Sequence, residues 1–149
     1  MRWATFVLVA VLAAGCNDLR DFRGHWEGPR VGDSAEVRVG VAMAAHAQLD
    51  VNDIDQHGLA ATLTVDGLAT AVPIVSLAGA EADAISDMTF AGSPLRVYMA
   101  FAPISDGHGD ALAIIALYDH DRIEVRVLRG GSNPLYGIFA LSEALEDTP

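Results

Sequence analysis

One stretch of the sequence gathers oxygen and nitrogen donors closely enough to suggest a metal site. Residues 50–58, DVNDIDQHG, hold three aspartates, an asparagine and a histidine. Counted from Asp53, they place acidic residues at positions one and three and Gly58 at position six of a calcium loop. Position five is His57, however, and position twelve is Thr64 where a bidentate glutamate is required. The stretch therefore favours an acidic, solvated turn ahead of a strand.

Other residue types that support catalysis lack the required spacing. The five histidines form no His-x-His or His-Glu-x-x-His pair and stand at positions 25, 46, 57, 108 and 120. Gly32-Asp33-Ser34 looks like the start of a GDSL hydrolase block, but the Asp-x-x-His of that family is absent from the sequence. Gly-x-Ser-x-Gly is absent as well. We therefore expect no enzyme, and we predict no catalytic residue, no metal ligand and no cofactor.

The amino-acid composition excludes further classes of reaction and binding site. The only cysteine is Cys16, and all nine basic residues are arginine. A chain without lysine cannot form a Schiff base or supply the lysine of a P-loop. The formal net charge of −11 disfavours nucleic acid as a partner, because phosphates repel an acidic surface. A length of 149 residues suits a single domain.

The first residues have the pattern of an export signal. Arg2 is followed by twelve residues without charge, Trp3 to Ala14, and then by Gly15 and Cys16. A positive start, an apolar run and small residues at its end are typical of a secretory signal. A helix of this length reaches about 20 Å, whereas the hydrocarbon core of a bilayer needs about 30 Å. We therefore expect a signal peptide over residues 1–15 and no membrane-spanning anchor.

Ala13-Ala14-Gly15-Cys16 resembles the lipobox of bacterial lipoproteins, although Leu is usual at the first of these positions. The resemblance implies that the Cys16 thiol receives a diacylglyceryl group and that signal peptidase II cuts before it. Acyl chains would then anchor residues 16–149 to a membrane of the cell envelope. We expect the outer membrane, because Asn17 is not the aspartate that favours inner-membrane retention. Ordinary signal cleavage, which leaves Cys16 unmodified, is the alternative.

The remaining sequence is dominated by an alternation of period two, which is typical of half-buried strands. Such alternation occurs in residues 36–41, 61–65, 95–101 and 123–127. Residues 111–118, ALAIIALY, are apolar at every position, so we expect this strand to be covered on both faces. Residues 45–50 and 81–88 are open to a second interpretation, as short helical turns. Asp66-Gly67 predicts a two-residue hairpin turn.

Turn signals separate roughly eight to ten short strands, which predicts an all-β domain. We expect an antiparallel meander closed into a barrel, with a sandwich as the alternative. The expected organisation is a signal peptide over residues 1–15, a short tether over residues 16–21 and a single domain over residues 22–149.

Gly24-His25-Trp26, at the start of that domain, resembles the Gly-x-Trp of the lipocalin and calycin barrels. In that family the tryptophan closes one end of the barrel, and an arginine late in the chain packs across its ring. Arg126 and Arg129 are the candidates for that arginine here. The resemblance also implies a barrel interior that receives a small, partly apolar ligand. Large side chains expected to face that interior are Met99, Phe101, Tyr118 and Phe139.

Two functions remain open from the sequence. The first is an envelope lipoprotein that binds a small, partly apolar ligand inside a β-barrel. The second is an interaction, accessory or inhibitor lipoprotein that grips an envelope protein through loops or an edge strand. For neither function does the sequence predict which residues bind a ligand. A ligand binder needs an enclosed cavity, whereas an interaction protein needs a packed centre and an exposed apolar patch.

Overall fold

The computed structural model describes residues 18–31, 42–43, 45–66, 71–77, 90, 92–103, 109–119, 122–131 and 134–144. Within them lie one short 3-10 helix, η1 (Leu19–Phe22), and nine strands. The strands are β1 (Gly24–Pro29), β2 (Ala42–Met43), β3 (His46–Ile54), β4 (Leu59–Val65), β5 (Val72–Ser76), β6 (Arg96–Ala102), β7 (Ala111–Tyr118), β8 (Arg122–Arg129) and β9 (Leu135–Glu143). In this part of the chain no helix has the length and apolar character needed to cross a membrane.

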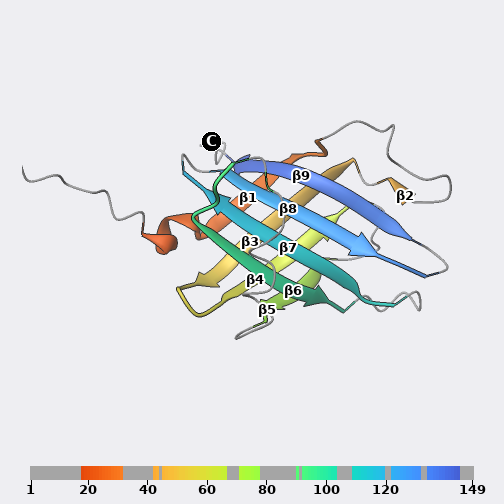
Figure 1. The fold of residues 1–149 in the computed structure, drawn as a ribbon, viewed down its shortest axis with the longest axis horizontal. Helices are drawn as coiled ribbons and strands as arrows, with labels where there is room; N and C mark the ends of the chain where they lie inside the picture. Colours follow the sequence, from red (N-terminus) through yellow and green to blue (C-terminus); the bar gives the residue numbers. More distant parts are fainter. Residues whose placement is uncertain are drawn as a thin grey trace, which may run out of the picture.

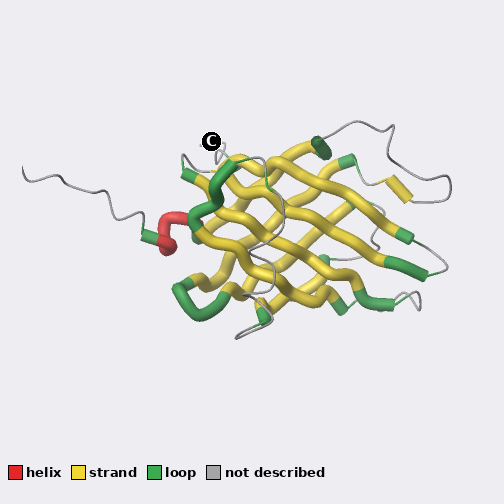
Figure 2. Tube along the Cα trace, in the orientation of Figure 1, coloured by secondary structure: helices red, strands yellow, loops and turns green. Residues whose placement is uncertain are grey.

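Eight of these strands form a closed antiparallel barrel (Figures 1 and 2). From β3 to β8, each strand pairs with the one that follows it in the chain. β1 pairs with both β3 and β9, and this double pairing closes the cylinder. β2 stands outside the meander and pairs in parallel with the start of β9. The predicted all-β meander is confirmed, and it closes as a barrel, not as a sandwich.

Most of the predicted strands are confirmed. The alternating runs in the second half of the chain and residues 61–65 fall in β4, β6, β7 and β8. Every residue of β7 except Leu112 is buried, as expected for a strand covered on both faces. Residues 45–50 do not form a helical turn, because most of them belong to β3, where Ala47 and Leu49 face the core. Residues 36–41 and 81–88 lie outside the described residues.

The two-residue hairpin turn predicted at Asp66-Gly67 falls partly outside the described residues, because Gly67 is not among them. β4 ends at Val65 and β5 begins at Val72, and Leu63 pairs with Val72. β4 and β5 are therefore adjacent antiparallel strands.

The inward face of the barrel is apolar and filled. The side chains of the buried cluster are exposed by 4% or less, and those with 0% exposure include Trp26, Leu49, Leu63, Ile115 and Phe139. A large void would leave accessible surface on the atoms that line it. The described inward side chains therefore leave no ligand-sized space among themselves.

One end of the barrel, which we call the η1 end, is closed by η1. The rings of Phe22 and Trp26 stack with their centroids 5.7 Å apart. The Trp26 indole Nε1 donates a hydrogen bond of 2.9 Å to the carbonyl oxygen of Phe22. Leu19 also packs against the buried cluster. The chain therefore packs on the barrel from Leu19 onward, and residues 16 and 17 of the predicted tether lie outside the described residues.

The arginine expected over Trp26 is not provided by Arg126 or Arg129. Trp26 pairs with Glu143 of β9, whereas Arg129 pairs with Leu135. These two positions on β9 are eight residues apart, or about 26 Å along a strand. The guanidinium of Arg126 lies over the ring of Phe90, 4.6 Å from its centroid. The prediction is wrong because the ring of Phe22 occupies the place against Trp26.

Gly28 allows the first and last strands to approach closely. A Cβ atom at this position would lie 1.9 Å from the carbonyl oxygen of Ala140. Only glycine fits where another backbone passes at that distance. The closing pairs themselves are few, Trp26 with Glu143 and Glu27 with Ser142. Closure therefore depends on a glycine at residue 28.

Candidate functional site

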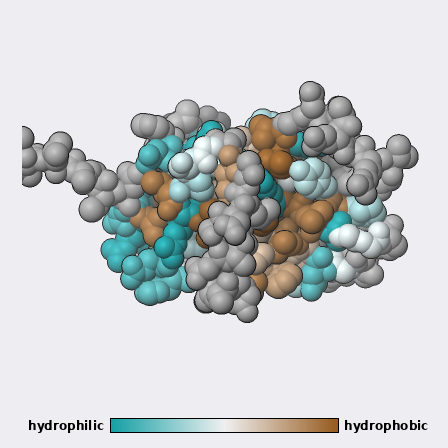
Figure 3. Space-filling view, in the orientation of Figure 1, coloured by the Kyte–Doolittle hydropathy of each residue, from teal (hydrophilic) through white to brown (hydrophobic). Residues whose placement is uncertain are grey.

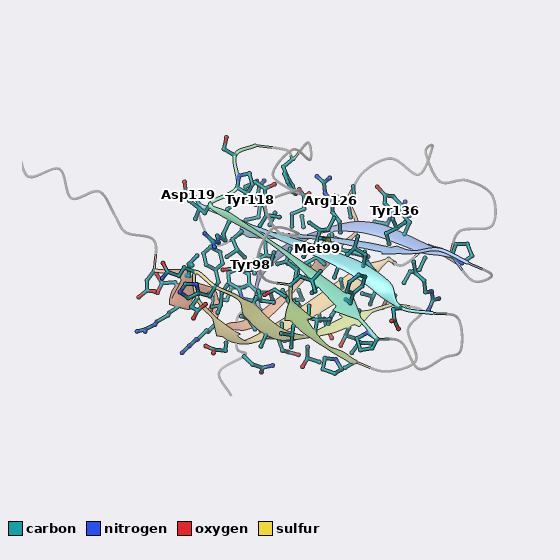
Figure 4. The ribbon with its side chains drawn as sticks, turned by 60° about the horizontal axis from the view of Figure 1, so that its bottom comes forward. Tyr98, Met99, Tyr118, Asp119, Arg126 and Tyr136 are labelled. Atoms are coloured by element: carbon teal, nitrogen blue, oxygen red, sulfur yellow. The ribbon has the colours of Figure 1, made fainter. Side chains whose placement is uncertain are left out.

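Three of the four side chains expected inside the barrel lie on its outer face. Tyr98 belongs to the buried cluster, and Figure 4 shows it between the two walls of the barrel. Met99 is its neighbour on β6 and therefore points outward, and Phe101, on the same face, is 54% exposed. Tyr118 is buried but is not part of the inner cluster. The prediction is confirmed only for Phe139, which is fully buried inside.

Beyond Tyr98, the inward face of β6 is built from small residues. Ala100 and Ala102 are fully buried and pair with Ala113 and Ala111 of β7. An eight-stranded barrel has an interior only wide enough for side chains to fill, so small residues on some strands make room for large ones on others. The large side chains of Met99 and Phe101 lie on the outer face.

On that outer face, five neighbouring strands carry one continuous row of apolar side chains. Cross-strand pairs join Val75 to Phe101, Phe101 to Leu112, Leu112 to Leu128, and Leu128 to Tyr136. We call these five residues the apolar row. It runs across β5 to β9, a span of about 19 Å at a strand spacing of about 4.8 Å. Figure 3 shows brown, hydrophobic surface gathered over these strands.

The apolar row is open to solvent. Val75 is 68% exposed, and Phe101 and Leu128 are each 54% exposed. Single exposed apolar residues are common on protein surfaces, but a contiguous group of large ones marks an interaction site. None of its five members is charged, although the chain is strongly acidic. The row is therefore the described surface best suited to bind a partner.

Closer to the η1 end, the same outer face is covered. Ile114, Ala116 and Tyr118 lie outside the inner cluster, yet they are only 7%, 0% and 4% exposed. Phe90 lies over the guanidinium of Arg126, and a Cβ on Gly92 would be 3.7 Å from the ring of Tyr118. Phe90 and Gly92, which precede β6, therefore lie against this outer face, and the apolar row lies beside the covered region.

A polar cluster lies within this covered region (Figure 4). Arg126 Nε donates a hydrogen bond of 2.6 Å to Oε1 of Glu124, whose side chain is 10% exposed. The guanidinium of Arg122 lies 4.1 Å from the centroid of the Tyr118 ring. Burial raises the pKa of the Tyr118 hydroxyl, and the nearby Glu124 carboxylate raises it further. These contacts join polar side chains of β8 to each other, to Tyr118 of β7 and to Phe90.

Of the acidic turn predicted over residues 50–58, residues 55–58 form the turn between β3 and β4, whereas residues 50–54 belong to β3. Asp55 Oδ1 accepts hydrogen bonds from the backbone N–H groups of His57, at 2.7 Å, and Gly58, at 2.9 Å. These hydrogen bonds hold the pKa of the Asp55 carboxyl below its ordinary value. Among the described residues, no group of three or more His, Cys, Asp or Glu side chains could hold a metal ion. The turn is thus stabilised by its own backbone.

β6 fixes this turn over the η1 end of the barrel. The Tyr98 hydroxyl donates a hydrogen bond of 2.7 Å to the carbonyl oxygen of Asp55. The guanidinium of Arg96 donates to the carbonyl oxygen of Gln56. Burial raises the pKa of Tyr98. The inward face of β6 therefore carries two polar residues that support the turn.

Two open grooves flank the turn. The larger, of about 640 Å³, lies between η1 and the turn and is lined by Asp18, Leu19, Arg20, Ile54, Asp55, Gln56 and His57. The smaller, of about 350 Å³, lies between the turn and the end of β5, where Val75 and Ser76 line it. Both are surface grooves outside the barrel interior.

Of the histidines considered from the sequence, His25 lies in a small polar cluster on the outer surface. His25 hydrogen-bonds Asp50, its cross-strand neighbour, and its Nε2 lies 3.9 Å from Oε2 of Glu27. All three side chains are at least two-fifths exposed on the outer surface, so these three residues do not form an enclosed site. Cys16 and residues 32–34 lie outside the described residues, as do the histidines at 108 and 120.

Comparison with known proteins identifies no relative. No family model matches the chain, and neither a curated protein nor a solved structure matches it.

Proposed function

We propose that this chain is a non-enzymatic interaction lipoprotein of the bacterial envelope, which docks a partner protein on the apolar row. The observation that carries the proposal is the combination of a filled barrel centre with an exposed apolar surface. The inner cluster is at most 4% exposed, whereas Val75, Phe101 and Leu128 are more than half exposed. A ligand inside the barrel needs the opposite arrangement.

The features of the surface favour side-chain docking by a protein. The barrel is closed by β1 and β9, so its meander offers no free edge for strand addition. The strongly negative chain repels nucleic acid and anionic lipid. The row itself is uncharged and spans five strands, which suits an apolar patch on another envelope protein.

The envelope location rests on Cys16 and is tested by mass spectrometry. The intact mass of the protein from isolated membranes is measured for the wild type and for Cys16→Ser. We expect the wild type to match residues 16–149 plus acyl chains and the variant to remain unprocessed. A wild-type mass without acyl chains would refute the lipoprotein assignment.

The docking surface is tested with a photoreactive amino acid placed at Val75, at one end of the row. We expect a discrete protein adduct in whole cells, weakened at least tenfold by the double substitution Phe101→Ser and Leu128→Ser. The matched control places the same group at Thr62, a half-buried position on β4, beyond the row. An adduct that forms equally at Thr62, or that survives the double substitution, would refute docking at the row. An adduct with twice the mass of the chain would identify the partner as a second copy.

A further inference from the structure

The geometry points to the side of the molecule that faces the membrane. We infer that the η1 end lies against the lipid surface and that the groove between η1 and the Asp55–Gly58 turn receives phospholipid headgroups there. This inference rests on the acylation of Cys16 proposed above. Its three supports are the length of the tether, the rigidity of η1 and the chemistry of the groove.

The tether is very short. Asp18 follows Cys16 by two residues, and two extended residues reach at most about 7 Å. The headgroup layer on each side of a bilayer is about 5–7 Å thick, from a total of 40–45 Å and a hydrocarbon core of about 30 Å. An acylated Cys16 at the hydrocarbon boundary therefore holds Asp18 within or next to the headgroups.

Asp18 is not free to move away from the barrel. Its side chain accepts a hydrogen bond of 3.1 Å from the backbone N–H of Arg20, as the cap of η1. Its carbonyl oxygen accepts a hydrogen bond of 2.9 Å from the backbone N–H of Asp21. The rest of η1 is held by Phe22, which stacks on Trp26 inside the barrel. Residue 17 alone therefore stands between Cys16 and the part of the chain held to the barrel, so an acylated Cys16 would keep the η1 end toward the membrane.

The side-chain charges of the groove at this end are complementary to the phosphate and ammonium charges of a zwitterionic headgroup. Arg20 is exposed along one wall and can pair with a phosphate. Asp18 and Asp55 are also exposed along the groove and can pair with an ammonium group. Leu19 adds apolar surface. Phosphate with ammonium is the chemistry of zwitterionic phospholipids, which this mixed groove suits better than purely anionic ones.

The orientation also places Phe101 and Leu128 of the apolar row away from the membrane. Arg96 begins β6 at the η1 end, and Phe101 follows five residues later, about 16 Å along the strand. Figure 1 shows η1 at the left, and β8, which leads from this end to Leu128, runs toward the right. Val75, by contrast, lines the smaller groove beside the turn and lies nearer the η1 end. Phe101 and Leu128 therefore lie on the side of the aqueous compartment, where a protein partner can reach them.

The orientation is tested by spin labels on the acylated protein, whose own thiol is blocked by the lipid. Gln56→Cys places a label at the groove, and Asp66→Cys places one on an exposed residue at the opposite end. The protein is reconstituted into vesicles of phosphatidylethanolamine and phosphatidylcholine. We expect the label at 56 to be at least twofold less accessible to a water-soluble nickel chelate than the label at 66. Equal accessibility of the two labels in acylated protein would refute the orientation.

A tether variant provides the matched control. Six Gly and Ser residues inserted between Asn17 and Asp18, combined with Arg20→Glu, should bring the label at 56 to the accessibility of the label at 66. Arg20→Glu alone, with the short tether, should raise accessibility at 56 because the groove then repels phosphate. No change with Arg20→Glu alone would refute the headgroup contact. Intact mass reports acylation in each sample, so failure of the anchor is distinguished from failure of the orientation.

Discussion

Trp26 combines a fully buried ring with a satisfied polar atom. Its indole N–H is paired with the carbonyl oxygen of Phe22, and its ring is stacked on that of the same residue. A buried donor without a partner would cost about 1–3 kcal/mol, and an aromatic pair contributes about 0.5–1.5 kcal/mol beyond its buried area. The two residues therefore close the barrel as a unit.

We expect Phe22→Ala to lower the free energy of unfolding by about 3–5 kcal/mol, the range for removing a buried aromatic side chain. Leu128→Ala serves as the control, because this side chain is 54% exposed and its loss should cost about 0.5 kcal/mol or less. Urea unfolding of both variants measures the difference. Equal losses would show that η1 does not close the barrel.

Because the pKa of Tyr98 is raised, we expect the free energy of unfolding of the barrel to decrease at alkaline pH. The folded chain holds this proton more tightly than the unfolded chain, because burial disfavours the charged phenolate. The resulting stability is complete below the ordinary tyrosine pKa of about 10 and is lost as pH rises through the raised value. We expect Tyr98→Phe to flatten the alkaline decline in unfolding free energy, measured against Tyr136→Phe. A decline that is unchanged by Tyr98→Phe would contradict this.

The lowered pKa of Asp55 makes stability depend on pH in the opposite direction. Backbone N–H groups of His57 and Gly58 lower the pKa of its carboxyl, so its contribution to stability is present above about pH 3.9, the ordinary value for aspartate. That contribution is lost as pH falls through the lowered folded pKa. We expect carbon-detected NMR to show Asp55 titrating below the ordinary aspartate value, and Asp55→Ala to loosen the turn because it removes the acceptor of both backbone N–H groups. A midpoint at or above the ordinary value would be inconsistent with these hydrogen bonds.

At the scale of the strands, alternation predicted where the elements lie but not which face of each points inward. On β6, the more apolar set of alternating residues includes Met99 and Phe101, and the sequence predicts that this set faces the core. The structure places Tyr98 and Ala100 there, because the narrow interior is already filled from the opposite strands. Period two defines two faces, and the choice between them depends on volume across the whole barrel.

The apolar row could not be predicted from any single strand. Its members come from five strands and are separated by as many as 26 residues between neighbours, Val75 and Phe101. Only the cross-strand register brings them together, and register was not accessible from the sequence. The acidic turn, by contrast, was predicted because its Asp, His and Gly residues are adjacent in the chain.

Closure at the strand level depends on Gly28. We expect Gly28→Ala to destabilise the barrel by several kcal/mol, because the new methyl group would meet the Ala140 carbonyl oxygen, and overpacking typically costs about 1–3 kcal/mol or more. Gly130→Ala is the matched control, since a Cβ there meets nothing within 4 Å. Thermal melts of the two variants compare them directly. A Gly28→Ala melt that coincides with the Gly130→Ala melt would contradict the close approach.

At the scale of the whole molecule, β9 holds the barrel together on both of its sides. It pairs with β8 along eight positions and with β1 at the point of closure. We expect a chain that stops after residue 134 to remain unfolded, because its buried cluster would lose Leu135, Phe139 and Leu141. Circular dichroism and hydrogen exchange test this. Protected amides in β3 and β4 of the shortened chain would contradict it.

The meeting of β1 with β9 also bears on the proposed export and acylation. Trp26 pairs with Glu143, 117 positions later, so the cylinder cannot close until nearly the whole chain is available. If the chain is exported amino-terminus first, Cys16 would emerge while the barrel is still open. Enzymes that acylate and cleave the N-terminal segment would then act on an unfolded chain, and not on a cysteine three residues before the packed η1. Under this proposal, attachment to lipid would come before the domain acquires its shape.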